Sequence, residues 1–224
     1  RFNGEKFIKE AVNKGASVVV CSKSCKIRDN SILIIKTNKI RHLLSDVASK
    51  FYKLKPKNII AVTGTNGKTS VSDLFYQILR INNIGVASIG TLGIKYNDKI
   101  IKTSLTSPDT ITLHKNLNYL KNKKINNIII EASSHGLDQK RLHHINFKGA
   151  IFTNFSQDHL DYHKTMKSYL NAKLILFRKI LSKKSTIISN DEIPTFKILS
   201  QIAKKKNFKI LNIKKTLKKI NNID

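Results

Sequence analysis

The feature that most constrains this chain is a glycine-containing loop between an apolar run and an amphipathic helix. The run at residues 59–62 leads into T-G-T-N-G-K-T at residues 63–69. Apolar residues then recur from Val71 to Leu79 at the spacing of one helix face. A strand, a loop and a helix N-terminus in this order form an anion site, because backbone N–H groups and the helix dipole face the ligand. The sequence therefore predicts a phosphate-binding loop.

The residue types of the loop suit a nucleotide. Gly64 and Gly67 allow the backbone to approach phosphate oxygens. Lys68 is placed to reach the β- and γ-phosphates, and the Thr69 hydroxyl to bind Mg²⁺. The usual motif G-x-x-x-x-G-K-[ST] has a glycine where this chain has Val62, so the loop is a shortened form. A strand–turn–helix that uses glycine for geometry alone is the alternative. The residues expected to bind nucleotide are Gly64, Thr65, Asn66, Gly67, Lys68, Thr69 and Ser70.

After this loop, short apolar runs alternate with amphipathic helices. Such runs are typical of strands buried on both faces of a parallel sheet. One helix has its leucines at positions 113, 117 and 120, and residues 92–103 predict a hairpin with its turn at residues 96–99. The alternation indicates an α/β fold with a mostly parallel sheet. The predicted strands are residues 58–62, 127–130, 150–153 and 186–189.

A smaller α/β pattern precedes the loop. It consists of a helix around Ile8 and Val12, strands at 16–20 and 31–35, and a helix at about 40–52. The following segment L-K-P-K-N contains Pro56 and suits a domain connector. We therefore expect two domains, residues 1–55 and residues 56–224. The lysine-rich end has no clear stop signal, so we expect the chain to be cut short.

Composition excludes several classes of protein. With 40% hydrophobic residues the chain can bury a core. No apolar run is long enough to cross a bilayer and the start does not read as a signal peptide, so we expect a cytoplasmic protein without a membrane partner. Cys21 and Cys25 have no second cysteine pair or nearby histidines, which favours reduced structural thiols over a metal site.

The formal charge of +28 raises the possibility of nucleic-acid binding. However, the lysines are scattered along the whole chain, and arginine, which suits bidentate phosphate or base recognition, is scarce. Charge alone describes solubility and nonspecific attraction rather than fold. We therefore expect no nucleic-acid partner.

A carboxylate ends the predicted strand at residues 127–130. Glu131 would lie in the crevice at the carboxyl ends of the strands, where parallel sheets bind ligands. Mg²⁺ prefers few carboxylates together with phosphates and waters. The sequence therefore predicts Glu131 as a Mg²⁺ ligand, and a carboxylate that caps the next helix is the alternative.

The shortened loop resembles the ATP loop of the Mur ligases and of the related folylpolyglutamate synthetases, which form amide bonds through an acyl phosphate. The segment E-A-S-S-H-G-L at residues 131–137 resembles the branch of the Mur ligases that adds the third amino acid of the peptidoglycan peptide. T-S-P-D at residues 106–109 is similar to the family's T-T-P-[DE] substrate loop. The resemblance implies that the residues that bind UDP-MurNAc-dipeptide are Thr106, Ser107, Ser133, Gln139 and Arg141.

Residues 153–163, T-N-F-S-Q-D-H-L-D-Y-H, match the family motif T-N-x-S-x-D-H-L-D-Y-H. Soft ligands are absent, so the two aspartates and two histidines do not indicate zinc. The resemblance implies that His159 helps to bind a second Mg²⁺ and that Asn154 and Asp158 shape the nucleotide pocket. A capping loop with solvated histidines is the alternative.

Lys173 lies in the middle of a predicted apolar helix face. On a helical wheel it falls among Met166, Tyr169, Leu170 and Phe177. A buried lysine responds by a lowered pKa, and a neutral amine can react with CO₂. The segment A-K-L-I-L-F resembles the family's A-K-x-x-L-F, whose lysine is carbamylated and helps to hold Mg²⁺. We favour that role over a lysine that extends to the surface.

The resemblance implies an ATP- and Mg²⁺-dependent ligase whose catalytic residues are Lys68, His159 and the carbamate of Lys173. It would phosphorylate the D-Glu γ-carboxylate of UDP-MurNAc-L-Ala-D-Glu, and the amine of a diamino acid would then attack. Meso-diaminopimelate is the expected amino acid, and the alternatives are an L-lysine-adding form or another Mur or folylpolyglutamate-type ligase. We expect a monomer, and we expect the chain by itself to be inactive.

Overall fold

Strand β3 (Asn58–Thr63), which leads into the glycine loop, lies inside an eight-stranded sheet in the computed structural model, which describes residues 4–221. The strand order is β10-β9-β8-β3-β7-β4-β5-β6. β7 (Asn127–Glu131) and β8 (Phe147–Phe152) pair with β3 in parallel, one on each side. The connection that follows β3 leads to the β7 side of the sheet, whereas the connection that follows β7 leads to β8 on the other side of β3. Such a reversal creates the crevice where open α/β sheets bind ligands.

The other strands extend the sheet to both sides. They are β4 (Val86–Gly90), β5 (Gly93–Tyr96), β6 (Lys99–Ile101), β9 (Thr186–Ser189) and β10 (Lys209–Asn212). Within this sheet only β5 runs against the other strands, antiparallel to both β4 and β6, and with β6 it forms the predicted hairpin, with positive φ values at Asn97 and Asp98 in its turn. The mostly parallel α/β fold and the hairpin are confirmed. β4 and β10 are two strands that the sequence analysis did not predict.

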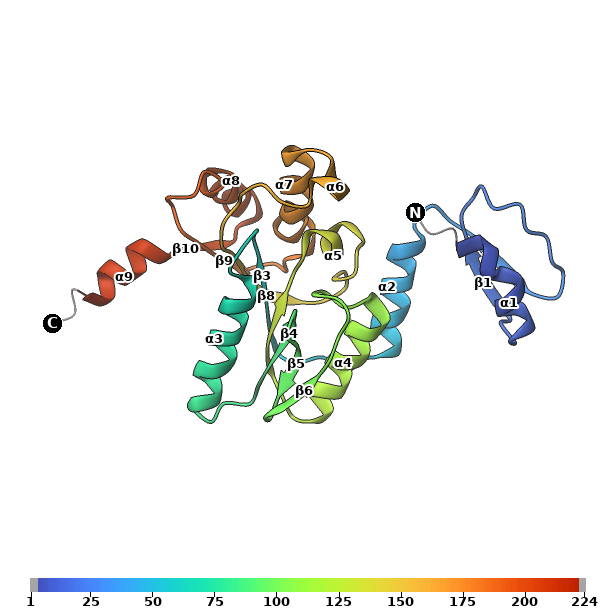
Figure 1. Cartoon of the computed structure of the whole chain (residues 1–224), viewed down its shortest axis with the longest axis horizontal. Helices are drawn as coiled ribbons and strands as arrows, with labels where there is room; N and C mark the ends of the chain where they lie inside the picture. Colours follow the sequence, from blue (N-terminus) through green and yellow to red (C-terminus); the bar gives the residue numbers. More distant parts are fainter. Residues whose placement is uncertain (1–3, 222–224) are drawn as a thin grey trace. The chain divides into compact units, whose positions relative to one another are not determined.

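The helices surround this sheet, and Figure 1 shows the central strands between α3 and α4. α3 packs against β3, β4 and β7. The three leucines predicted on the second helix are fully buried in the core. The helical segments that follow the connector are α3 (Lys68–Ile81), α4 (Thr110–Asn122), α5 (Ser134–Asp138), α6 (Leu160–His163), α7 (Met166–Ile175), the π-helical turn η2 (Leu176–Ile180), α8 (Phe196–Lys206) and α9 (Ile213–Asn221).

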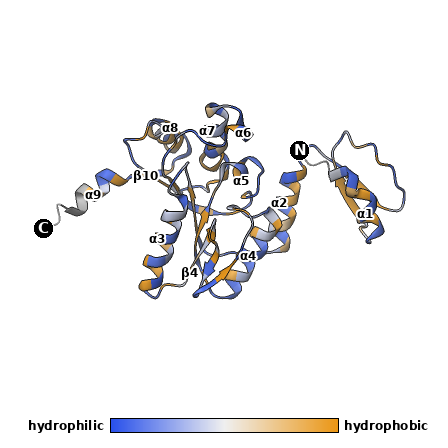
Figure 2. Ribbon diagram, in the orientation of Figure 1, coloured by the Kyte–Doolittle hydropathy of each residue, from blue (hydrophilic) through white to orange (hydrophobic). Residues whose placement is uncertain are grey.

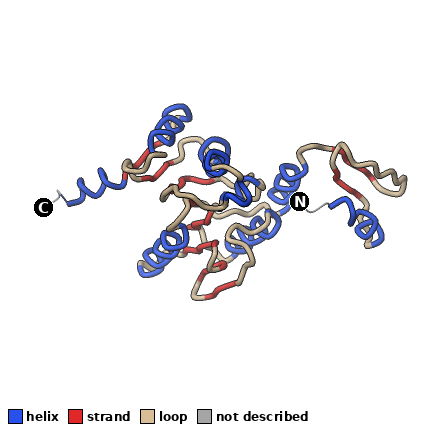
Figure 3. Tube along the Cα trace, turned by 45° about the horizontal axis from the view of Figure 1, so that its top comes forward, coloured by secondary structure: helices blue, strands red, loops and turns tan. Residues whose placement is uncertain are grey.

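The main cluster of the hydrophobic core lies on one face of the sheet, and further apolar side chains are buried on the opposite face. It includes Ile59, Ile128, Ile130, Phe147 and Phe152 from the three central strands. Figure 2 shows apolar residues along these strands, and Figure 3 shows helices and loops around them. No helix among residues 4–221 is long and apolar enough to cross a membrane.

The chain divides into two compact units, residues 1–44 and residues 45–224. The first contains the 3₁₀ turn η1 (Gly4–Phe7), α1 (Ile8–Asn13) and a parallel pair formed by β1 (Val18–Cys21) and β2 (Leu33–Lys36). Ile8 and Val19 pack there with Cys21 and Cys25, whose thiols are free and buried. α2 (Ile40–Phe51) contains the division between the units, and the domain junction at residues 55–56 stays a prediction.

The strands β3, β4, β7 and β8 are mutually parallel, so their carboxyl ends lie at one edge of the sheet. β3 is followed by the glycine loop, β7 ends in Glu131, and β8 is followed by the histidine–aspartate loop. Motifs that are distant in the sequence therefore meet at this edge.

Candidate active site

The glycine loop has a positive φ at two positions, a backbone conformation that favours glycine. Gly64 has a φ of 149° and Gly67 a φ of 81°. A Cβ on Gly64 would lie 1.9 Å from the Oγ1 of Thr153, so the loop packs closely on the end of β8. α3 begins at Lys68, directly after the loop. The unpaired N–H groups of its first turn and the positive end of its dipole therefore face the site, as phosphate binding requires.

Lys68 carries a positive charge into this loop. Its Nζ donates to the backbone oxygens of Gly64, at 3.1 Å, and Thr65, at 2.7 Å. Burial lowers the pKa of Lys68, while Glu131 and Asp158 raise it. Among the described residues no carboxylate forms an ion pair with Lys68. Its charge is thus available to a phosphate.

The carboxylate of Glu131 is almost completely buried, with 1% of the residue exposed. Its Oε2 accepts from the hydroxyls of Thr69, at 2.9 Å, and Thr91, at 3.1 Å. Its Oε1 accepts from the backbone N–H of Thr91 at 3.0 Å. Three accepted bonds leave lone-pair capacity on the carboxylate, and no cationic side chain in the described part of the chain forms an ion pair with it.

A buried carboxylate without a paired cation, next to a threonine hydroxyl, fits a hard divalent cation. Residues 4–217 contain no cluster of three or more histidine, cysteine, aspartate or glutamate side chains able to hold a metal by themselves. That agrees with Mg²⁺, which takes one or two carboxylates and completes its shell with phosphates and waters. Thr69 and Glu131 are therefore chemically suited to the predicted Mg²⁺ site.

Lys173, on α7, is buried beside the phosphate loop. Only 1% of the residue is exposed, and its Nζ donates to the backbone oxygen of Gly64 at 2.6 Å. The same Nζ lies 4.3 Å from the ring centroid of Tyr169. Burial, helped by the charge of Lys68, lowers the pKa of Lys173 to about 7. The predicted burial of this lysine is confirmed, and its carbamylation stays a prediction.

The histidine–aspartate loop contacts the glycine loop through its first residue. The Oδ1 of Asn154 accepts from the backbone N–H of Asn66 at 2.9 Å. Asp158 accepts from the backbone N–H of His159, and the Nε2 of His159 lies 3.5 Å from the second oxygen of Asp158. His159 adopts a positive φ of 51°, which turns the chain at the start of α6. Asn154 therefore positions the glycine loop.

Aromatic rings pack around His159. Its ring centroid lies 4.9 Å from that of His135 and 5.9 Å from that of Tyr169. Burial is the main cause that lowers the pKa of both His135 and His163. The contacts with the rings of His135 and Tyr169 hold His159 in place. No role for His135, His163 or Tyr169 was predicted from the sequence.

Four of the five predicted substrate residues, Ser107, Ser133, Gln139 and Arg141, form one hydrogen-bond network. The hydroxyl of Ser107 donates to the backbone oxygen of Glu131 at 2.7 Å and lies 3.0 Å from that of Ser133. Arg141 donates to the backbone oxygen of Ser107 at 2.8 Å and to Oε1 of Gln139 at 2.6 Å. These bonds join the loops that follow β6 and β7. The Ser107 side chain is buried, whereas Ser133 lines the cavity described next.

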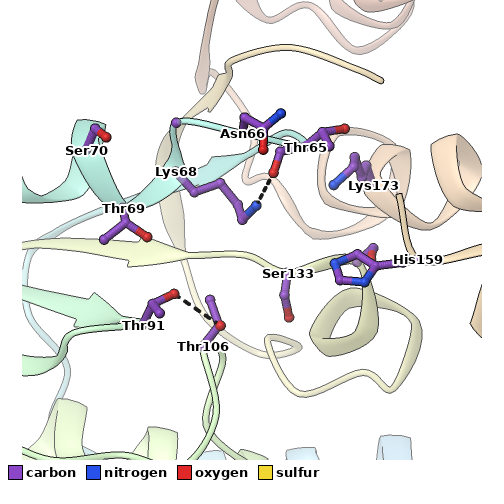
Figure 4. Close-up of a pocket in the computed structure, with 12 residues that line it drawn as sticks. Thr65, Asn66, Lys68, Thr69, Ser70, Thr91, Thr106, Ser133, His159 and Lys173 are labelled. Carbon is purple, nitrogen blue, oxygen red and sulfur yellow. Dashed lines mark hydrogen bonds between the residues drawn. The ribbon is translucent and has the colours of Figure 1, made fainter. Parts of the chain in front are cut away.

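A cavity of about 250 Å³ joins the two parts of the site, and Figure 4 shows the side chains that surround it. The phosphate loop lies on one side and the loops with Thr106 and Ser133 on another. Thr91 and Ser134 also line it, although the sequence analysis did not select them. The lining residues are Thr65, Asn66, Gly67, Lys68, Thr69, Ser70, Thr91, Thr106, Ser133, Ser134, His159 and Lys173.

Known proteins are similar to this chain in both sequence and fold. Residues 62–222 match the Mur ligase middle domain. A curated relative from Rickettsia bellii, named UDP-N-acetylmuramoyl-L-alanyl-D-glutamate--2,6-diaminopimelate ligase, is 40% identical over 215 residues, which cover 93% of this chain and 44% of the relative. A relative of the same name from Brucella melitensis is 38% identical over 181 residues, 81% of this chain and 37% of the relative.

Solved structures of proteins from the same family have a similar fold. One of a UDP-N-acetylmuramoyl-L-alanyl-D-glutamate--2,6-diaminopimelate ligase has a TM-score of 0.78 at 28% identity, covering 93% of this chain and 42% of that one. MurF from Acinetobacter baumannii shares the fold, with a TM-score of 0.60 at 19% identity, over 95% of this chain and 43% of that one. The chain spans less than half the length of these proteins. It belongs to the Mur ligase family, and residues 62–222 form the middle domain of that family.

Proposed function

We propose that the protein carrying this chain uses ATP to add meso-diaminopimelate to UDP-MurNAc-L-Ala-D-Glu in peptidoglycan synthesis. The names of the similar ligases supply the reaction and both substrates. One observation carries the proposal in this chain: the phosphate loop and the loops of Thr106 and Ser133 surround one cavity, and two residues of its lining, Thr69 and Thr91, donate hydrogen bonds to the buried carboxylate of Glu131. That arrangement allows a nucleotide phosphate and a second substrate to lie within reach of each other.

The chain's part in the reaction is to position groups and to neutralise charge. ATP supplies the phosphoryl group and Mg²⁺ would be held by Thr69 and Glu131. Lys68, with no carboxylate partner in the described chain, would bind the phosphates and stabilise the negative charge during transfer to the D-Glu γ-carboxylate. The incoming amine then attacks the acyl phosphate and phosphate leaves. No side-chain nucleophile is needed.

Lys173 and His159 are proposed to complete the metal site. A pKa of about 7 leaves much of the Lys173 amine neutral near neutral pH, which is the form that reacts with CO₂. The carbamate would replace a cation beside Lys68 with an anion. It could then hold a second Mg²⁺ together with His159, while Asn154 and Asp158 shape the nucleotide pocket.

The UDP-linked substrate is proposed to lie on the other side of the cavity. Thr106 and Ser133 line the cavity there, and Ser107, Gln139 and Arg141 hold the loops that present them. We propose further that residues 1–55 belong to the domain that binds the UDP group and residues 56–224 to the ATP-binding domain. A cytoplasmic monomer without a nucleic-acid or membrane partner fits this function.

Nucleotide binding is also known for a protein of this fold. The solved structure of MurF from Thermotoga maritima, with a TM-score of 0.55, is a complex with ADP. Its identity of 17% supports the fold alone. For this chain, therefore, ATP binding rests on the loop geometry and on Lys68.

Ligation by the full-length protein tests the proposal. UDP-MurNAc-L-Ala-D-Glu, Mg²⁺ and ATP are supplied with diaminopimelate or with L-lysine in separate reactions. We expect product with diaminopimelate, none without ATP, and a loss of at least about a hundredfold in rate for Lys68→Met. Product with lysine alone would assign the lysine-adding form. No product with either, from a folded protein that binds ATP, would contradict the third-amino-acid assignment.

A further inference from the structure

Thr91 connects two parts of the candidate site that come from distant segments of the sequence, Glu131 and Thr106. It directly follows β4 and lines the cavity. Its backbone N–H and its hydroxyl both donate to Glu131, one to each carboxylate oxygen. Its Oγ1 also lies 3.2 Å from the Oγ1 of Thr106, a contact that Figure 4 shows as a dashed line. Thr91 thus contacts the predicted metal ligand and the predicted substrate loop together.

The direction of these hydrogen bonds follows from the chemistry of a hydroxyl, which has one hydrogen and two lone pairs. The hydrogen of Thr91 is directed at Oε2 of Glu131. In the contact with Thr106, Thr91 therefore accepts and Thr106 donates. The result is a chain of hydrogen bonds from Thr106 through Thr91 to the Glu131 carboxylate.

We propose that Thr91 is a positioning residue that orients Glu131 for Mg²⁺ and transmits substrate binding at Thr106 to the metal site. The inference rests on the proposed function, because that function places Mg²⁺ at Glu131 and the UDP-linked substrate at Thr106. A substrate group that accepts the hydrogen of Thr106 turns that hydroxyl away from Thr91. Thr91 is then held by Glu131 alone, so the two sites become coupled.

Gly90, which precedes Thr91, shows how closely the end of β4 packs against the Glu131 carboxylate. A Cβ on Gly90 would lie 2.0 Å from Oε1 of Glu131, so the carboxylate occupies the space that a side chain there would need. Thr91 provides two of the three hydrogen bonds that the carboxylate accepts, and Thr69 provides the third. Without the Thr91 hydroxyl, Oε2 keeps only its bond from Thr69. Thr69 is itself a predicted Mg²⁺ ligand.

The first test measures the affinity for Mg²⁺ in the presence of a nonhydrolysable ATP analogue, by calorimetry on the full-length protein. Groups that orient a metal ligand typically contribute tenfold or more to metal affinity. We therefore expect Thr91→Val to weaken Mg²⁺ binding about tenfold. Thr91→Ser, which keeps the hydroxyl, is expected to stay within about twofold of the unmodified protein, as hydroxyl retention preserves the bond.

Thr110→Val is the matched control. The Thr110 hydroxyl is buried and has no hydrogen-bond partner within residues 4–217, so its removal breaks no bond. We expect Mg²⁺ affinity in this variant to equal that of the unmodified protein. Equal Mg²⁺ affinity in Thr91→Val and the unmodified protein would overturn the inference. So would equal losses in Thr91→Ser and Thr91→Val, because the effect would then not depend on the hydroxyl.

The second test uses Thr106→Val and does not depend on the folding of Thr91→Val. The Mg²⁺ affinity is measured with and without saturating UDP-MurNAc-L-Ala-D-Glu. We expect the substrate to change the Mg²⁺ affinity of the unmodified protein and to leave that of Thr106→Val unchanged. The same change in both proteins would show that the hydrogen-bond chain transmits nothing.

The two proposals fail in different ways. If the unmodified protein shows no Mg²⁺-dependent nucleotide binding and no ligation, the proposed function fails. If it binds Mg²⁺ with the nucleotide and ligates diaminopimelate, but Thr91→Val does the same with equal Mg²⁺ affinity, only the role of Thr91 fails.

Discussion

At the scale of single residues, the surroundings of Lys173 act on the pKa of its amine in opposing directions. The carbonyl of Gly64 and the ring of Tyr169 favour the ammonium form, because both present negative charge to a cation. Burial and the nearby Lys68 oppose that form, and the pKa falls to about 7. The opposing effects leave a mixture of charged and neutral amine near neutral pH, whereas an exposed lysine is fully protonated there.

The reactivity of Lys173 toward CO₂ is therefore expected to depend on pH. In ¹³C-bicarbonate, a carbamate signal measured by NMR should grow between about pH 6 and about pH 8, because the neutral fraction of an amine rises through its pKa. Lys173→Arg should lack this signal, since a guanidinium stays charged. A signal of equal size in Lys173→Arg, or none in the unmodified protein at the higher pH, would contradict the carbamate assignment.

Glu131 yields a second prediction at this scale. Glu131→Gln keeps the shape of the side chain and removes its charge, so the hydroxyls of Thr69 and Thr91 keep an acceptor. We expect the affinity for Mg²⁺ with an ATP analogue to fall at least about tenfold, because a carboxylate is the ligand that Mg²⁺ prefers. Binding of the analogue without Mg²⁺, followed by fluorescence, should change little. Unchanged Mg²⁺ affinity would exclude Glu131 as a ligand.

At the scale of elements, the sequence predicts strands well where they are continuously apolar. Residues 58–62 and 127–130 correspond to β3 and β7, because parallel strands buried on both faces need apolar side chains throughout. β4 was not predicted in this way. Val86–Gly90 is completely buried, but three of its residues, Ala87, Ser88 and Gly90, are small. Small residues give a weak hydrophobic signal, and Thr91 was missed together with the strand that precedes it.

β10 was not predicted because its residues are not continuously apolar or buried. It lies at an edge of the sheet, and its residues Lys209–Asn212 are only partly buried or exposed. Natural edge strands often carry lysines, which discourage pairing with other chains. The candidate site shows a similar limit. Its motif residues could be predicted, whereas the rings of His135 and Tyr169 are brought to His159 only by tertiary packing.

The fit of β4 beneath Glu131 gives a prediction for this element. In Gly90→Ala the new Cβ would meet the carboxylate, so either the strand or Glu131 must move. We expect a loss of ~1–3 kcal/mol in the free energy of unfolding, as for other overpacked cores, together with weaker Mg²⁺ binding. Gly85→Ala is the control, since nothing lies within 4 Å of its Cβ. Similar effects of both substitutions on denaturant unfolding would contradict this packing.

α4 contains a histidine whose burial predicts acid sensitivity. His114 is completely buried and its Nε2 lies 3.2 Å from the backbone oxygen of His143. Burial, with a contribution from Lys55, lowers the pKa of His114 to about 4. Between that value and the unfolded value of about 6.5, the unfolded state binds more protons. Stability is therefore complete above about pH 6.5 and is lost as the pH falls toward 4.

Denaturant unfolding at a series of pH values tests this dependence. His114 should contribute a loss of up to ~3 kcal/mol over this interval, since one pKa unit corresponds to ~1.4 kcal/mol. His114→Leu removes the titrating group, so its stability should depend less steeply on pH between about 4 and about 6.5. The same slope in both proteins would show that His114 does not titrate as proposed.

At the scale of the whole molecule, the resemblance found in the motifs and the comparison over residues 62–222 agree on one family. The α/β class, the parallel sheet and the meeting of motifs at one sheet edge could all be predicted, because each follows from local patterns and from sheet topology. The hydrogen bonds within the site could not, because they depend on side chains from segments far apart in the sequence. The formal charge of +28 had no part in these predictions.

The proposed reaction transfers a phosphoryl group to a substrate carboxylate without a side-chain nucleophile. ¹⁸O in the D-Glu γ-carboxylate of UDP-MurNAc-L-Ala-D-Glu tests this route most directly. When the amine displaces the acyl phosphate, one carboxylate oxygen leaves with the phosphate. We therefore predict ¹⁸O in the inorganic phosphate, at one labelled oxygen for each amide bond formed, by mass spectrometry. Amide product with unlabelled phosphate would contradict the acyl-phosphate route.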